Sequence, residues 1–292
     1  MERLKMIIKK WTWVWMGIGI LALLFTGCDL GTDRYERRMT QRWDIHQLGS
    51  FPIPTTIQAK TLNGSIVVRS FEGNHIQIDT RAVVQGFGAK ETKEFGDNLQ
   101  VQFTNNNGVL TFWVDDRTPH FITNIGISFE ILVPNQWLDD LHLTTSNGPI
   151  TIEHLRADLD IRTSNGGVTL RNTEGLIQVQ TTNGRVTMDR VRLSEGSSTI
   201  RSSNGQITFQ GELPSSGLLD WRTSNARVTV DVPRDTAFHG DIRTSNGSIQ
   251  ITDLQHIDHV FSRTEFRGSI NGGGNLHLRI VSSNGDITLR GK

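Results

Sequence analysis

A four-residue phrase, Ser/Thr-Ser/Thr-Asn-Gly, constrains the fold of this chain more than any other feature of its sequence. It occurs seven times, with one Gly-to-Ala change at Ala226, and its asparagines are Asn147, Asn165, Asn183, Asn204, Asn225, Asn246 and Asn284. Successive asparagines are 18, 18, 21, 21, 21 and 38 residues apart. The last spacing is 21 plus 17, so we expect one degenerate copy near Arg267. A period of about 20 residues is typical of a stacked repeat.

The residues around each asparagine follow a second pattern, an alternation of apolar and polar side chains. Counted from the asparagine, positions −4, +3 and +5 are apolar in all seven copies, as at Leu143, Ile150 and Ile152 in the first. The positions between them are mostly polar. Alternation with a period of two predicts two half-buried strands in each repeat. We expect the Asn-Gly pair between them to form a tight turn in which both residues adopt positive φ.

Two arrangements satisfy this pattern: a series of antiparallel hairpins, or a β-solenoid in which each repeat is one coil. The same residue type recurs at the same distance from each motif asparagine. This regularity favours the solenoid, because identical side chains stack in register when coils lie on one another. One coil buries about four apolar side chains, too few to order some 20 residues alone, so neighbouring coils must stabilise one another. We therefore predict an all-β, parallel β-helix-like solenoid with coils of about 17–22 residues and Ser-Asn-Gly turns.

The regular repeats occupy residues 141–292, and residues 51–140 carry weaker copies of the same phrase. Asn63-Gly64 and Asn107-Gly108 are each followed by an alternating apolar stretch. Between them, residues 85–97 are rich in glycine and charge and predict a loop inserted between strands. Terminal coils of solenoids are commonly atypical because they cap the stack, so we expect residues 51–140 to form its degenerate first part.

The N-terminus has the composition of a secretory signal. Four basic residues within positions 3–10 precede the uncharged, largely apolar stretch 11–27, and the single cysteine, Cys28, follows at once. This arrangement resembles a bacterial lipobox, in which the cysteine is acylated and becomes the mature N-terminus. Phe25 departs from the leucine usual at its position. The resemblance implies an apolar signal helix over 1–27 and lipidation of Cys28.

An uncleaved membrane anchor remains the alternative, because 17 apolar residues are at the short limit for spanning a bilayer. Both interpretations place residues 29–292 on the extracytoplasmic side of a membrane. Residues 28–50 are polar and charged and predict a tether that becomes ordered near Trp43, which we expect to cap the first coil.

An arginine row is the strongest candidate for a binding site. Arg162, Arg201, Arg222 and Arg243 occupy position −3, and the last three belong to consecutive repeats. The row predicts an outward stripe for an anion such as teichoic acid, a lipid headgroup or an acidic glycan. Alternatively, aspartates two residues before Arg162, Arg222 and Arg243 neutralise it as surface ion pairs.

Other ligands and reactions find little support in the sequence. The chain carries 30 basic and 30 acidic residues, so no net field favours nucleic acid. The one cysteine and the scattered histidines form no metal-ligand motif, and His256 and His259 fit a surface loop. No phosphate-binding loop or nucleophile elbow occurs. We predict no cofactor, no metal and no catalytic residue.

The Ser-Asn-Gly repeat, the strand-like stretch Phe129–Pro134 and the lipoprotein signal together resemble the DUF4097 family of bacterial envelope proteins. The resemblance covers about residues 55–292 and is strongest over 129–292. It implies a non-catalytic cell-envelope protein, a surface adhesin or binding scaffold whose partner is an envelope glycan or protein. An envelope-stress sensor is the alternative. An enzyme acting on polysaccharide is the least favoured hypothesis, since it needs carboxylates clustered on one outward face.

Overall fold

The structure is a computed structural model that describes residues 32–44, 54–114, 118–135 and 137–292. The predicted signal helix over 1–27 and the predicted lipidation site Cys28 lie outside the described residues. Among the described residues, no helix has the length and apolar character needed to cross a bilayer.

The regular secondary structure of the described chain is almost entirely β-strand. In the N-terminal part the strands are β1 (Asp33–Asp44), β2 (Thr56–Lys60), β3 (Ile66–Phe71), β4 (His75–Gly86), β5 (Val101–Asn106), β6 (Val109–Val114) and β7 (Ile122–Pro134), with the helix α1 (Ala89–Asn98) between β4 and β5. The middle strands are β8 (Asp140–Thr145), β9 (Ile150–Glu153), β10 (Asp158–Thr163), β11 (Val168–Arg171), β12 (Glu174–Gly175), β13 (Ile177–Thr181), β14 (Val186–Leu193), β15 (Gly196–Ser202) and β16 (Ile207–Glu212). The last are β17 (Ser216–Thr223), β18 (Val228–Val232), β19 (Phe238–Thr244), β20 (Ile249–Thr252), β21 (His256–Phe261), β22 (Glu265–Ile270), β23 (Asn275–Ser282) and β24 (Ile287–Gly291).

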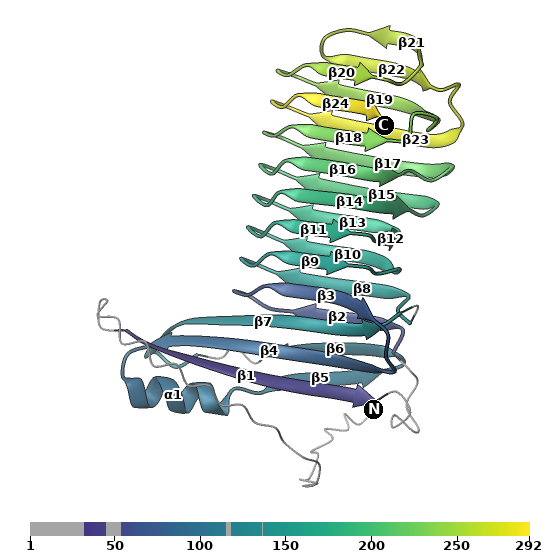
Figure 1. The fold of residues 1–292 in the computed structure, drawn as a ribbon. Helices are drawn as coiled ribbons and strands as arrows, with labels where there is room; N and C mark the ends of the chain where they lie inside the picture. The colour runs from purple at the N-terminus through teal and green to yellow at the C-terminus, as the bar shows by residue number, and fades with distance from the viewer. Residues whose placement is uncertain (1–31, 45–53, 115–117, 136) are drawn as a thin grey trace, which may run out of the picture. The chain divides into compact units, whose positions relative to one another are not determined.

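Each repeat contributes one strand to each of two long sheets (Figure 1). The strand before the Asn-Gly turn joins sheet B and the strand after it joins sheet A. Ile161 of β10 pairs in parallel with Leu143 of β8 and Val179 of β13, which keeps equivalent positions opposite one another. Both sheets are mixed, because antiparallel strands flank the parallel ones at the ends. Parallel coils, not hairpins, therefore form the regular part of the stack.

The core lies between the two sheets and consists of the predicted apolar positions. Every residue at −4, +3 and +5 of the seven repeats is buried except Ile251, which is partly exposed on the edge strand β20. The largest core residue, Trp221, packs against Phe209 with ring centroids 5.1 Å apart. The alternation in the sequence is thus the alternation between core and solvent.

The coils do not stack in sequence order at either end. The first coil, β2–β3, lies between the coil β6–β7 and the coil β8–β9. The last coil, β23–β24, lies between β17–β18 and β19–β20. The first and last coils in the sequence therefore lie inside the stack. The coils at the two ends of the stack, β6–β7 and β19–β20, come from between them in the sequence.

This order explains the long spacing of 38 residues and corrects the prediction of a degenerate coil near Arg267. That region forms the antiparallel hairpin β21–β22, and β22 pairs antiparallel with β19. The loop Asn271–Gly274 then carries the chain past β19 to β23 on its other side. All four residues of this loop have positive φ, which explains its run of glycines.

Two predictions in the N-terminal part are wrong. The stretch 85–97 is not a loop, since α1 occupies most of it, and the predicted tether is largely the strand β1, which pairs antiparallel with β4. Contacts distant in the sequence hold the helix: Arg37 of β1 donates to the carbonyl of Leu99 at 3.1 Å, and Tyr35 hydrogen-bonds Asp97. Trp43 pairs through its backbone with Ile76, and its side chain lies outside the described residues, so its role as a cap stays a prediction.

The Asn-Gly turns differ from the expectation of positive φ, since no Asn or Gly of the seven motifs adopts it. The glycine is required by a close contact between coils: a Cβ on Gly166 would lie 1.7 Å from the carbonyl oxygen of Gly148. The same clash, at 1.7–1.9 Å, would arise at Gly148, Gly184, Gly205 and Gly285.

Side chains complete these turns as two ladders. The Asn165 amide donates to the Asn147 amide oxygen at 2.7 Å, and equivalent bonds link the motif asparagines from Asn63 to Asn246. The hydroxyl of Thr163 accepts a hydrogen bond from the Gly166 N–H at 3.1 Å. Among the described residues the corresponding bond is missing at Ala226, the one motif that lacks glycine.

The change Gly166→Ala tests the close contact between coils. The new methyl group overlaps the Gly148 carbonyl, so we expect the free energy of unfolding to fall by roughly 3 kcal/mol or more. Gly167→Ala is the matched control, because its Cβ would lie 3.4 Å from its nearest neighbour, the Arg185 oxygen, and we expect a change below about 1 kcal/mol. Denaturant unfolding measures both, and equal effects would contradict the contact.

Candidate functional site

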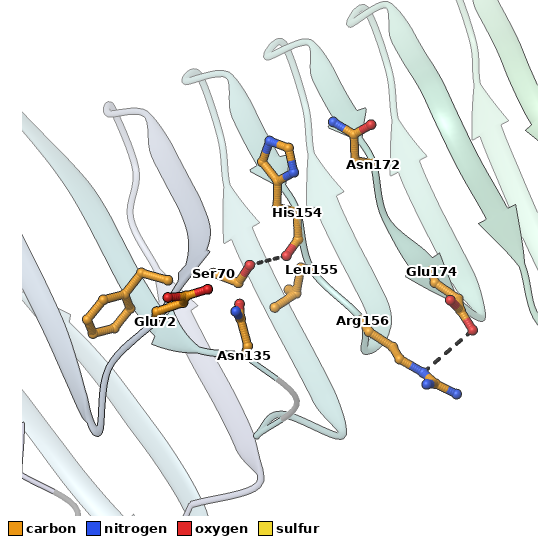
Figure 2. A pocket seen from close by; sticks show the side chains of 9 residues that line it. Ser70, Glu72, Asn135, His154, Leu155, Arg156, Asn172 and Glu174 are labelled. Carbon is orange, nitrogen blue, oxygen red and sulfur yellow. Dashed lines mark hydrogen bonds and ion pairs between the residues drawn. The ribbon is translucent and has the colours of Figure 1, made fainter.

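Three hollows lie along one edge of the stack, where the chain leaves sheet A. We call this the hollowed edge and define it by residues 70–72, 154–156, 172–174, 190–192, 210–212, 231–235 and 253–255. The first hollow, of about 520 Å³, is shown in Figure 2 and includes Ser70, Glu72 and Asn135 in its lining. The second, also about 520 Å³, shares Asn172 and Glu174 with it, and the third is about 650 Å³.

Left-handed backbone shapes this edge. His154, Asn172 and Arg190 have φ of 58°, 49° and 53°, and each stands seven residues after a motif asparagine. Positive φ is uncommon outside glycine and turns the chain sharply. The positive φ predicted for the Asn-Gly turns thus occurs at the opposite turn of the coil. His154 and Asn172 belong to successive coils beside the first hollow, as Figure 2 shows.

The charges of the hollowed edge and of the adjoining sheet A strands alternate in sign and pair. Glu153 lies 2.8 Å from Arg69 Nε and 2.9 Å from Arg171 Nη1. Hydrogen bonds from these two guanidinium groups, that from Arg69 first, lower the pKa of the Glu153 carboxyl. Arg156 lies 3.5 Å from Glu174. The edge therefore presents polar groups with no dominant charge.

A further pair of this kind is Arg192 with Glu212, whose atoms Nε and Oε2 are 2.8 Å apart. The hydrogen bond to Glu212 raises the pKa of the Arg192 guanidinium. Both residues line the second hollow, so an acid and a base face a ligand there together.

Asp231 is the most unusual polar group of the hollowed edge. It lines the second hollow, is 7% exposed, and its Oδ2 lies 2.5 Å from Lys292 Nζ. Its Oδ1 is buried and has no hydrogen-bond partner among the described residues. An unsatisfied buried carboxylate oxygen is costly, and because this atom is shielded from solvent, the contact of Oδ2 with Lys292 is what offsets the cost.

The structure places all four arginines of the predicted row on the outer face of sheet B and beside carboxylates. Arg162 lies 2.9 Å from Asp160, and Arg222 and Arg201 lie 2.8 and 3.5 Å from Asp220. Arg243 lies 3.0 Å from Asp241 Oδ1, without the alignment of a hydrogen bond, and 3.3 Å from Glu265.

The row is also less continuous than the sequence indicates. Arg201 and Arg222 are direct neighbours, but Gln180 stands between Arg162 and Arg201, and Val281 stands between Arg222 and Arg243. The insertion of the last coil separates residues that occur in consecutive repeats. An anion would have to compete with the bound carboxylates, and the row stays a prediction.

Other residues singled out in the sequence have structural places. The motif asparagines form the ladder at the first turn. His256 Nδ1 lies 2.5 Å from Asp258 Oδ1 on β21, and no group of three or more potential metal ligands occurs among the described residues. The hollowed edge lies outside the outward strand positions that the repeat pattern singles out. In the sequence this edge is marked only by residues two positions after +7, where Arg156, Glu174 and Arg192 alternate in charge from coil to coil.

The chain belongs to the DUF4097 family, described as Toastrack, whose model matches residues 56–290. Similar solved structures include a protein from Clostridium sporogenes, provisionally named a cell adhesion protein, with 10% identity and a TM-score of 0.35 over 88% of this chain and 100% of that one. A protein from Bacteroides fragilis, provisionally named an adhesin, has 13% identity and a TM-score of 0.34 over 87% and 97%. A protein from Parabacteroides distasonis, provisionally named a lipid-binding protein, has 10% identity and a TM-score of 0.37 over 86% and 96%. A comparison with curated proteins gives no match.

Proposed function

We propose that this protein is a non-catalytic binding protein of the bacterial cell envelope. A lipid on Cys28 holds it to the extracytoplasmic side of a membrane, and the hollowed edge binds a polar envelope polymer such as a glycan. The observation that carries the proposal is the line of three hollows along one edge, where acidic and basic side chains pair at several coils. A protein surface is the alternative ligand.

The regularity of the stack suits an extended ligand. Neighbouring coils are spaced by about 4.8 Å, so equivalent positions of successive coils recur at a constant interval along this edge. Paired carboxylates and guanidinium groups donate and accept hydrogen bonds while their charges cancel, which favours hydroxyl and amide groups over a polyanion.

The short distance in sequence between Cys28 and the first strand limits how far a lipid on Cys28 would let the stack extend from the membrane. Strand β1 begins at Asp33, so only residues 29–32 separate it from the predicted lipid. The stack then stands at the membrane surface, where envelope polymers are concentrated. Two acyl chains would hold the protein firmly, whereas one chain gives marginal binding.

The anchor is tested by Cys28→Ala in cells that express the full chain. Without the acylated cysteine, we expect the protein to leave the membrane fraction and appear in the soluble extracytoplasmic fraction. Fractionation and immunoblotting measure this. Retention of an unprocessed form in the membrane would contradict lipidation and support the uncleaved anchor.

The hollowed edge is tested by the triple change His154→Gly, Asn172→Gly and Arg190→Gly. Glycine adopts positive φ without strain, so these changes remove three side chains and keep the turns. We expect binding of the detergent-solubilised full chain to isolated cell walls to weaken by about tenfold or more, measured by co-sedimentation, since lost polar contacts cost about 1–3 kcal/mol each.

The matched control changes the other candidate surface, the arginine row at 162, 201, 222 and 243, to serine. We expect it to bind walls as the unchanged chain does. Loss of binding in this control, with binding kept in the triple glycine variant, would move the site to the arginine row. Absence of wall binding by the unchanged chain would overturn the proposed function.

A further inference from the structure

The four outer edges of the two sheets differ in how they are protected. At the N-terminal end of the stack, β1 bears charged residues along its length and β5 carries mostly polar ones. At the other end, β20 is four residues long, and the segment after β21 hydrogen-bonds to it through Ile249 N–H and the Arg263 carbonyl at 2.8 Å. The fourth edge, β21, is not covered by another segment and is not charged along its length, and of these devices it has only a bulge.

Strand β21 exposes apolar side chains beside an open backbone edge. Ile257 is 68% exposed, Phe261 46% and Val260 39%, and among the described strands β21 pairs with β22 alone. A strand of this kind is a template for pairing with another chain. The folded protein keeps it at the end of the stack, where a second strand can reach it.

A bulge in β21 places its side chains so that the inward and outward positions are arranged symmetrically about the centre of the strand. Ile257 and Val260 pair with Ser269 and Arg267 of β22, whose side chains face solvent. His256, Asp258 and Phe261 pair with Ile270, Gly268 and Phe266, which are buried. The register shifts between Asp258 and Val260, so His259 is the extra residue. Without the shift, Ile257 and Val260 would lie on opposite faces.

We propose that β21 pairs antiparallel with β21 of a second copy and forms a two-fold symmetric dimer. With the axis between Asp258 and His259, Ile257 lies opposite Val260 of the second copy, and His256 lies opposite Phe261. Outward residues thus meet outward residues, and inward residues meet inward ones. An isologous contact requires this self-complementarity.

The charges of the strand fit the same register. Asp258, whose Oδ1 already contacts His256 Nδ1 of its own chain, lies opposite His259 of the second copy, so each carboxylate at the centre of the dimer meets an imidazole from both chains. Opposite or hydrogen-bonding partners across antiparallel strands stabilise a pair, and like charges destabilise it. The aromatic group of His256, Phe261 and Phe266, with ring centroids 5.3–5.9 Å apart, is extended by its symmetric copy. This complementarity favours a second copy over an unrelated strand.

Charge exchange at the centre tests the dimer. We expect Asp258→Lys or His259→Glu alone to weaken dimerisation of the detergent-solubilised full chain about tenfold, since the first removes the carboxylate opposite His259 and the second places two carboxylates opposite one another. The double variant restores opposite charges, and we expect its dimerisation constant to return to within about threefold of the unchanged chain. Analytical ultracentrifugation measures the dimerisation constants. Leu218→Lys is the control, because Leu218 is exposed on β17, a strand away from the sheet edge, and we expect this change to leave dimerisation unaltered.

Cross-linking tests the register independently of these charges. In a Cys28→Ala background, a mixture of Ile257→Cys and Val260→Cys chains should form a disulfide-linked dimer, and either variant alone should form far less. A monomeric unchanged chain, single charge variants that dimerise normally, or equal cross-linking by the single cysteine variants would overturn the proposal. Pairing of the edge with a different protein in place of a second copy would also overturn it. These outcomes are separate from wall binding at the hollowed edge.

Discussion

The close contact between the glycine turns of neighbouring coils is the constraint on which the rest of the structure depends. A carbonyl oxygen occupies the space where a side chain would begin, so coils approach at one edge as closely as their backbones permit. The asparagine ladder and the buried threonine or serine hydroxyls fix the register at that edge. Each such hydrogen bond contributes about 1 kcal/mol, and every coil repeats it.

A fixed register makes the coils interchangeable, and the order of the stack shows the consequence. Both sides of every coil present the same ladder and similar apolar residues, so a coil from either chain end fits between two others. Inserting the end coils leaves antiparallel strands, β1 and β4 at one end and β22 and β21 at the other, to cover the outermost coils of the stack. The C-terminal strand β24 is then held on two sides, by β18 and β20, whereas β1 pairs with β4 alone.

The sequence was sufficient to predict the parallel stack and its core. Apolar residues such as Ile161 and Val168 alternate with polar ones and recur at the same distance from each motif asparagine, so few arrangements of the strands can bury them all. It was not sufficient for the coil order, since pairing between β17 and β23 depends on residues about 60 positions apart. Helix α1 has little apolar periodicity, and Tyr35 and Arg37 of a distant strand hold it. The sequence did not predict the hollowed edge because His154 and Asn172 lie at the turn opposite the Asn-Gly motifs. Their positive φ occurs there without a glycine to indicate it.

The inserted position of the last coil predicts an unusual stability for it, and amide hydrogen exchange measures that stability most directly. Residues 275–291 end the described chain, and a segment stacked in sequence order would fray from the end of the stack. Because this coil lies between β17–β18 and β19–β20, we expect its amides to be protected as strongly as those of β13 to β16. Exchange from 275–291 that is faster than exchange from the coil β19–β20 would contradict the inserted order and the stack built on it.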